Sequence, residues 1–280
     1  MPNVRGVTVP DLLYGTAWKE DATEGHVLEA LRAGFRGIDT ANQRKHYHEA
    51  GVGRGIARAI ADGVVRPGEL FLQTKFTFRD GQDHRLPYDP AAPIATQVAQ
   101  SFARSLEHLG VERLDSLVLH GPSQRDGLGP EDHEAWRAME AIAQRGAVRL
   151  LGVSNVTARQ VEDLVAFARV PPAFVQNRCY ANRGWDRAVR AVCAVHGVVY
   201  QGFSLLTANR AVVAARELAA IATHHGRTPE QIVLRFAQQL GMLPLTGTTD
   251  PTHMRQDLAI AGFTLASDEM AAIERSGTSP

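Results

Sequence analysis

Four side chains that can move protons stand at, or just after, the ends of short apolar runs in this 280-residue sequence. Asp39 ends "GID", Lys75 ends "FLQTK", His120 ends "LDSLVLH", and Tyr47 follows in "TANQRKHYHE". Burying an unpaired charge costs several kcal/mol, so we expect Asp39 and Lys75 to form an ion pair. The ammonium should lower the pKa of the Tyr47 phenol. Tyr47 could then protonate a carbonyl oxygen as hydride reaches its carbon, while His120 hydrogen-bonds that oxygen.

Further polar and aromatic residues occupy the same kind of position later in the chain. Ser154, Asn155 and Gln176 offer hydroxyl and amide groups that suit a carboxamide such as that of nicotinamide. Phe203 offers a ring face for a flat heterocycle. Trp18 is equally compatible with core packing and with a wall of the substrate site.

These residues can meet if the apolar runs are strands of one barrel. The runs alternate with helical patterns, which predicts a closed parallel (β/α)8 TIM barrel whose chemistry lies at the carboxyl ends of the strands. An open doubly wound sheet is the alternative, but it usually carries G-x-G-x-x-G where this chain has "YGTAWKED". The eight predicted strands are Leu12–Thr16, Gly37–Thr40, Leu70–Lys75, Asp115–His120, Leu150–Asn155, Ala173–Asn177, Val198–Gly202 and Met242–Thr246.

Several segments lie outside the simple repeat, and we expect one domain over residues 1–280. Val4–Val9 could form a hairpin that closes the barrel bottom. Gly121–Pro130 is a polar loop long enough to reach over the barrel top, Arg210–His225 is predicted as an additional helix, and Ser267–Arg275 as a last helix.

Local signals mark where the helices begin and end. Thr157 with Gln160 and Thr228 with Gln231 match capping boxes, and Asp250-Pro251 matches a cap followed by a first-turn proline. Glycines near helix ends suit a left-handed conformation, and these are Gly34, Gly110, Gly146, Gly197 and Gly241.

Composition excludes several functional classes. Thirty basic and thirty acidic residues cancel, which argues against a nucleic-acid or anionic-membrane partner. No apolar run approaches the ~20 residues of a membrane span, and the N-terminus does not resemble a signal peptide. Cys179 and Cys193 predict free thiols in a reducing cytoplasm. We expect a cytoplasmic monomer without a metal site.

The chain resembles the aldo-keto reductases over nearly all of its length. The motifs that carry the resemblance are "YGTAWKED", "FRGIDTA", "EAGVGRGI", "FLQTKF", "LDSLVLHGP", "LLGVSN", "FVQN", "QGFSLLT" and "DPTHMRQDL". Their number, order and strand-end placement make it specific. It implies reduction of a small aldehyde or ketone on a (β/α)8 barrel that binds NADPH in an extended pose, with NADH as the alternative.

The resemblance also assigns roles to residues. It implies the tetrad Asp39, Tyr47, Lys75 and His120. The substrate site would add Trp18 and Gly121 to Tyr47 and His120. The segment 204–208 would contact the pyrophosphate, and the last barrel helix would receive the adenosine end at its N-terminus, where N–H groups favour phosphate. The implied cofactor-binding residues are Gly15, Thr16, Ala17, Asp39, Ser154, Asn155, Gln176, Phe203, Ser204, Leu206, Thr248, Thr249, His253, Gln256 and Asp257.

The segment that carries the tyrosine departs from the family pattern. The usual tyrosine position, counted from Asp39 or from Glu49, falls on Arg44 or His46, because this segment is two residues longer. Tyr47 is the only phenol in the segment, and we assign the proton donor to it.

The two ends of the expected site depart as well. Gly121 replaces the usual aromatic after the catalytic histidine, which should widen the substrate pocket. Gly247-Thr248 and His253 replace the Lys-Ser and Arg that commonly grip the 2′-phosphate, unless Arg255 substitutes. The long C-terminal loop of many relatives is missing, so we expect an open site.

Two other functions use the same residues. A Schiff-base aldolase would use Lys75 as nucleophile, which an ion pair with Asp39 should prevent. A non-catalytic nicotinamide-binding module that senses redox state would need no complete tetrad.

Overall fold

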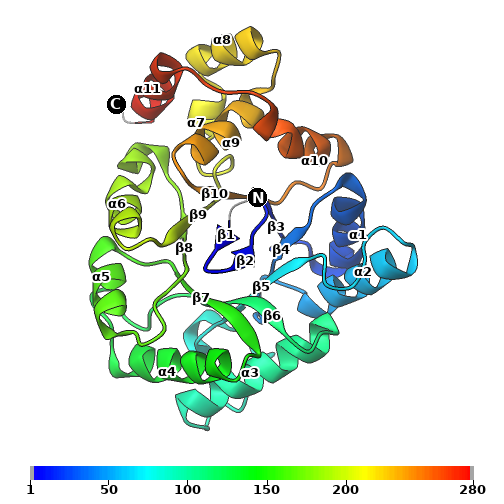
Figure 1. The fold of residues 1–280 in the computed structure, drawn as a ribbon, viewed down its shortest axis with the longest axis vertical. Helices are drawn as coiled ribbons and strands as arrows, with labels where there is room; N and C mark the ends of the chain where they lie inside the picture. Colours follow the sequence, from blue (N-terminus) through cyan, green and yellow to red (C-terminus); the bar gives the residue numbers. More distant parts are fainter. Residues whose placement is uncertain (1–2, 278–280) are drawn as a thin grey trace.

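The computed structural model describes residues 3–277, and its centre is a closed barrel of parallel strands with β10 paired to β3. The (β/α)8 prediction is therefore confirmed (Figure 1). Inward-facing positions at the carboxyl ends of these strands supply the site residues discussed below. The barrel strands are β3 (Leu13–Gly15), β4 (Gly37–Asp39), β5 (Phe71–Phe76), β6 (Leu114–Leu119), β7 (Val148–Ser154), β8 (Phe174–Arg178), β9 (Val199–Phe203) and β10 (Leu243–Thr246).

Helices surround the barrel and bury their apolar faces against its outer surface (Figure 1). No helix within residues 3–277 is long and apolar enough to cross a membrane. The α-helices are α1 (Thr23–Ala33), α2 (Glu49–Ala61), α3 (Ile94–Leu109), α4 (Pro130–Gln144), α5 (Ala158–Phe167), α6 (Arg187–Val195), α7 (Arg210–Val213), α8 (Arg216–His225), α9 (Pro229–Gln239), α10 (Pro251–Leu258) and α11 (Ser267–Ser276). Four short 3-10 helices are η1 (Glu20–Ala22), η2 (Arg79–Gly81), η3 (Ala181–Asp186) and η4 (Ala259–Gly262).

The predicted N-terminal hairpin is present as β1 (Asn3–Val4) and β2 (Val7–Thr8). It lies over the centre of the barrel in the view of Figure 1. Its buried valines form one apolar cluster with barrel residues such as Phe71 and Phe174. The hairpin therefore closes the amino-terminal end of the barrel and keeps water from that side of the interior.

The sequence signals at helix ends have the predicted geometry. The Thr157 and Thr228 side chains accept the N–H groups of Gln160 and Gln231, and Asp250 caps α10. The five glycines predicted at helix ends, Gly34, Gly110, Gly146, Gly197 and Gly241, all have positive φ.

The additional helix predicted over Arg210–His225 is wrong in one respect, because the segment forms two helices, α7 and α8. The chain is extended at Ala215, which has φ −68° and ψ 139°. Alanines favour helix on both sides of this break. Burial of Val212 on one side and Leu218 on the other accompanies the change of direction.

Close packing of α2 on α3 yields a stability prediction. A Cβ at Gly53 would lie 1.9 Å from the His108 carbonyl oxygen. Gly53→Ala should therefore lower the free energy of unfolding by about 2 kcal/mol or more, because backbone must move. Gly25→Ala in α1 is the control, since no atom lies within 4 Å of its Cβ position. It should raise stability by ~0.5–1 kcal/mol. Urea unfolding of both variants measures this, and equal effects would contradict the packing account.

Candidate active site

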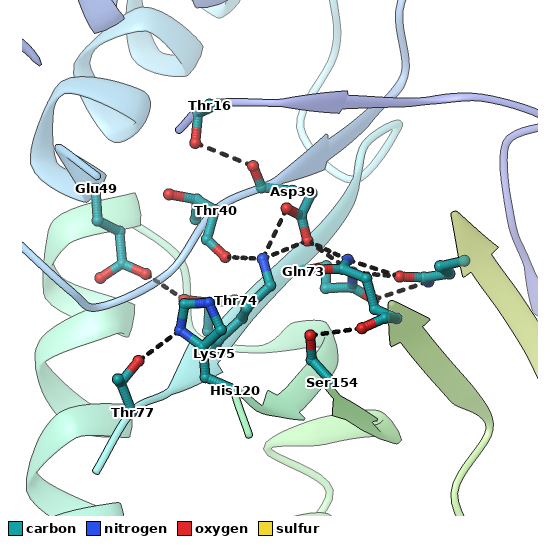
Figure 2. A network of polar contacts seen from close by, with 12 residues as sticks. Thr16, Asp39, Thr40, Glu49, Gln73, Thr74, Lys75, Thr77, His120 and Ser154 are labelled. Carbon is teal, nitrogen blue, oxygen red and sulfur yellow. Dashed lines mark hydrogen bonds and ion pairs between the residues drawn. The ribbon is translucent and has the colours of Figure 1, made fainter. Parts of the chain in front are cut away.

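The buried ion pair between Asp39 and Lys75 is the centre of the site. Lys75 Nζ lies 2.7 Å from both carboxylate oxygens of Asp39 and donates a third hydrogen bond to the Thr40 carbonyl at 2.9 Å. Both side chains are almost completely buried, with 2% exposure for Asp39 and 1% for Lys75, and Figure 2 shows the contacts between them. Burial lowers the pKa of the Lys75 ammonium, and the Asp39 carboxylate opposes that shift. All three N–H groups of Lys75 are thus engaged.

Buried amides complete the surroundings of Asp39. Its Oδ1 also accepts hydrogen bonds from Gln73 Nε2 at 2.8 Å and Gln176 Nε2 at 3.0 Å. A carboxylate that loses its hydration is stable only when its acceptor sites are filled in this way.

Tyr47 lies next to this pair, but its pKa is shifted in the opposite direction from the one predicted. The Lys75 ammonium is 5.2 Å from the centre of the tyrosine ring. Burial and the negative charge of Asp39 raise the pKa of the Tyr47 phenol. The predicted lowering of this pKa is wrong because burial and the Asp39 charge outweigh the attraction between the Lys75 ammonium and the phenolate. Within residues 3–277 the phenol has no hydrogen-bond partner, and Tyr47 lines the main cavity.

His120 lies against Tyr47, with ring centroids 5.9 Å apart. Its Nδ1 is 2.7 Å from the hydroxyl of Thr77, a residue that the sequence reasoning missed (Figure 2). Burial, and then the charge of Lys75, lower the pKa of His120 to about 3. The imidazole is therefore neutral at physiological pH, and its Nε2 has no hydrogen-bond partner among residues 3–277.

A cavity of about 1000 Å³ opens above these residues and runs along the carboxyl ends of the strands. It brings together most of the predicted cofactor residues, but Lys75 and Thr16 lie beneath its wall and Asn155 faces elsewhere. Asn155 and Ser204 have positive φ (56° and 55°), so strained backbone flanks the site. The predicted residues that line the cavity are Gly15, Ala17, Trp18, Asp39, Tyr47, His120, Ser154, Gln176, Phe203, Ser204, Leu206, Thr248, Thr249, His253, Gln256 and Asp257.

A second cavity, of about 620 Å³, lies on the other side of His120. Gly121 and Asn155 line it, together with Thr77 and His46. His46 and His120 line both cavities, so they mark the place where the two spaces meet. Gly121 lines this second cavity and not the main one, so the widening of the substrate pocket stays a prediction.

Trp18 forms an exposed wall of the main cavity. It is 72% exposed, and its ring stacks on His46 with centroids 4.1 Å apart. The Trp18 backbone N–H also donates to the His46 carbonyl at 2.7 Å. Core packing is therefore excluded for Trp18, and the lengthened loop is fastened to the β3 end of the site.

The far end of the main cavity has a charge distribution that the sequence did not predict. Lys19 lines the cavity there and donates to the Gly247 carbonyl at 2.7 Å, and burial lowers its pKa to about 8. It places an ammonium beside the residue that replaces the usual lysine. Arg255 is not among the lining residues. Arg178, at the end of β8, is a second cation on the wall.

The N-terminus of α10 differs from the expectation that free N–H groups await a phosphate. Asp250 Oδ1 accepts the Thr252 and His253 N–H groups at 2.6 and 3.2 Å. Glu230 and Asp257 add two carboxyl groups to the cavity wall nearby. Burial raises the pKa of Asp257 to about 6. This end of the site is therefore less favourable to an added phosphate than predicted.

The comparison with known families decides the assignment. The model of the Aldo/keto reductase family matches residues 13–277. The chain belongs to the aldo/keto reductase family. The reductase fold thus accounts for the strand-end placement of Asp39, Lys75 and His120.

Individual relatives cover most of this aldo/keto reductase. An aldo-keto reductase of Mycolicibacterium vanbaalenii is 32% identical over 95% of this chain and 88% of its own. The NAD(P)H-dependent D-xylose reductase of Aspergillus niger is 29% identical over 96% and 90%. The crystal structure of a Bombyx mori aldo-keto reductase in complex with NADP has a TM-score of 0.82 at 26% identity, covering 99% and 92%. The family match makes this protein an oxidoreductase of the aldo/keto reductase type.

One histidine cluster lies apart from the site, where no ligand set was predicted. Within residues 3–277, His224, His225 and Glu269 have ligand atoms within 4.8 Å of one another. His225 is ion-paired with Glu269 at 2.9 Å, and Glu269 also accepts the Ala266 N–H. The pair therefore joins α8 to α11, a role that stabilises the fold.

The raised pKa of Asp257 predicts how the stability of the protein changes with pH. Between pH ~4 and 6 the unfolded chain releases this proton while the folded protein keeps it, so stability is lost as pH rises. Asp257→Asn removes that penalty. Its free energy of unfolding should match wild type near pH 4 and exceed it by about 2–3 kcal/mol above pH 6. Chemical denaturation at pH 4, 5, 6 and 8 measures the difference. Asp126→Asn in an exposed loop is the control, and a gain independent of pH would contradict the assignment.

Proposed function

We propose that this aldo/keto reductase reduces an aldehyde or ketone to an alcohol, with NADPH as the hydride donor and Tyr47 as the proton donor. The observation that carries the proposal is one cavity that is lined both by Tyr47 and His120 and by Thr248, Gln256 and Asp257. A small carbonyl compound fits one end of this space and a dinucleotide fits the rest.

The residues present fit a dinucleotide. Phe203 offers a ring and Gln176 an amide beside the reacting end, and Ser154 lines the same wall. The backbone at Ser204–Leu206 and the Arg178 guanidinium line the same cavity and suit a pyrophosphate. Thr248, Gln256 and Asp257 would hold the adenosine end. When bound, the cofactor supplies the hydride.

The geometry supports different roles for Tyr47, His120 and Lys75 at the substrate carbonyl. Tyr47 lines the cavity and its hydroxyl has no hydrogen-bond partner among the described residues, so it can hydrogen-bond the substrate oxygen and give it a proton. His120 is neutral, and a Thr77 hydroxyl that donates to Nδ1 leaves the ring proton on Nε2. That N–H would hold the same oxygen in place. Lys75 stabilises the tyrosinate by its charge as the proton leaves.

The two other functions receive less support. A lysine nucleophile must be neutral and accessible, whereas Lys75 is buried and directs its N–H groups at three acceptors. A module that only senses redox state would have no need for an unpartnered phenol beside a neutral histidine. Trapping of substrate on Lys75 with borohydride, in the absence of nicotinamide, would favour the aldolase.

One prediction tests Tyr47 as the proton donor. Tyr47→Phe removes the hydroxyl alone, so kcat should fall ~10²–10⁴-fold while the Kd for NADPH stays within ~2-fold. Steady-state kinetics on an aldehyde panel and a fluorescence titration measure the two quantities. His46→Ala is the matched control in the same loop and should keep the greater part of kcat. An active Tyr47→Phe with an inactive His46→Ala would move the role to the neighbouring residue.

Another prediction concerns the choice between NADPH and NADH. With one buried lysine and several carboxyl groups at the adenosine end, we expect the Kd values for NADPH and NADH to differ by less than ~10-fold. Tryptophan-fluorescence titrations with both cofactors test this. A preference for NADPH above ~100-fold would show a phosphate site that these residues do not account for.

A further inference from the structure

The interior of the barrel just below the site is filled by amides instead of the branched apolar residues usual there. Gln73 on β5, Gln176 on β8 and Gln201 on β9 are 0%, 3% and 0% exposed. Buried amides are costly unless their donors and acceptors are satisfied. The presence of these amides beside Asp39 therefore indicates a function other than packing.

The three amides form a closed network with Asp39 (Figure 2). Gln201 Oε1 accepts from Gln73 Nε2 at 2.8 Å and from Gln176 Nε2 at 2.9 Å. Gln201 Nε2 returns a hydrogen bond to Gln73 Oε1 at 3.1 Å. The network thus crosses the barrel from β5 to β9 and ends on the carboxylate.

The hydrogen-bond donors and acceptors present fix the orientation of every amide in this network. Asp39 is paired with Lys75 and can only accept, so Gln73 and Gln176 must both turn Nε2 toward it. Gln73 and Gln176 then require an oxygen from Gln201. If Gln176 were reversed, its Oε1 would face the oxygens of Asp39 and Gln201 and meet only repulsion.

Both N–H groups of Gln176 are consumed by Asp39 and Gln201. Gln176 lines the cavity, and the amide atom left for a ligand is its carbonyl oxygen. We propose that Gln73 and Gln201 are positioning residues that lock Gln176 as a hydrogen-bond acceptor, so that the site selects a cofactor carboxamide by its NH2 group. This inference rests on the proposed function, because it takes Gln176 to face the nicotinamide.

The test compares two cofactors that differ in that group alone. The reduced 3-acetylpyridine analogue of NADP carries a methyl group in place of the carboxamide NH2. Wild type should bind NADPH ~10-fold more tightly than the analogue, the worth of one hydrogen bond to a fixed acceptor. In Gln201→Met one Gln176 N–H loses its acceptor, so the Gln176 amide can rotate about its remaining hydrogen bond to Asp39 and move its oxygen away from the ligand. The ratio of the two Kd values should then fall to ~2 or less. Gln73→Met should act in the same direction.

Ser116→Ala is the matched control. Ser116 is fully buried on the neighbouring strand β6, and its hydroxyl has no partner among the described residues. The control should leave the ratio unchanged, whereas a general loosening of the barrel would alter it in all variants. Thermal melts of each variant report folding independently of the ratio.

Each outcome has a defined meaning. A wild-type ratio near 1, or an unchanged ratio in folded Gln201→Met or Gln73→Met, overturns the positioning role and leaves the proposed reductase intact. Failure of wild type to bind NADPH at all overturns the proposed function itself. If both methionine variants fail to fold, Gln201→Asn takes their place, because it keeps an amide that is too short to reach Gln176, and it should lower the ratio in the same way.

Discussion

The structure of the site depends on one interaction, the ion pair of Asp39 and Lys75 inside the barrel. Each ion loses its hydration, at a cost of several kcal/mol, and neither charge is tolerated alone in this interior. The pair persists because Thr40 takes the last lysine N–H and two glutamines fill the remaining acceptor positions of Asp39. The polar interior of the barrel follows from this requirement.

The same ion pair changes the pKa values of its neighbours through its charges and not through direct contact. Its ammonium helps to keep His120 neutral, and its carboxylate helps to raise the pKa of Tyr47. A tyrosine with a raised pKa holds its proton firmly at rest, which suits a donor that must release it only when negative charge develops on a substrate oxygen. In the proposed mechanism, the positive charge of Lys75 would stabilise the tyrosinate formed at that moment. The buried pair would then supply the electrostatic arrangement that the proposed catalysis needs.

Much of this could be predicted from the sequence, and the failures have physical causes. Strand ends, the capping boxes at Thr157 and Thr228 and the hairpin follow from local signals that the fold does not override. The break between α7 and α8 carries no such signal, since alanines surround it. The pKa of Tyr47 depends on how completely the phenol is buried and how close it lies to Asp39, and the sequence encodes neither. The Asp250 cap was predictable, but it occupies N–H groups of α10 that a phosphate would need. The role of Thr77 depends on its distance from His120, which spacing along a chain does not encode.

Single-turnover oxidation of bound NADPH tests most directly whether the buried pair makes the site a reductase. The nicotinamide absorbance is followed after a short-chain aldehyde is mixed with wild type and with Lys75→Met, each preloaded with cofactor. We expect rapid oxidation in wild type and a rate at least ~100-fold lower in Lys75→Met at similar cofactor affinity. Equal rates in the two proteins, or no aldehyde-dependent oxidation in wild type, would contradict it.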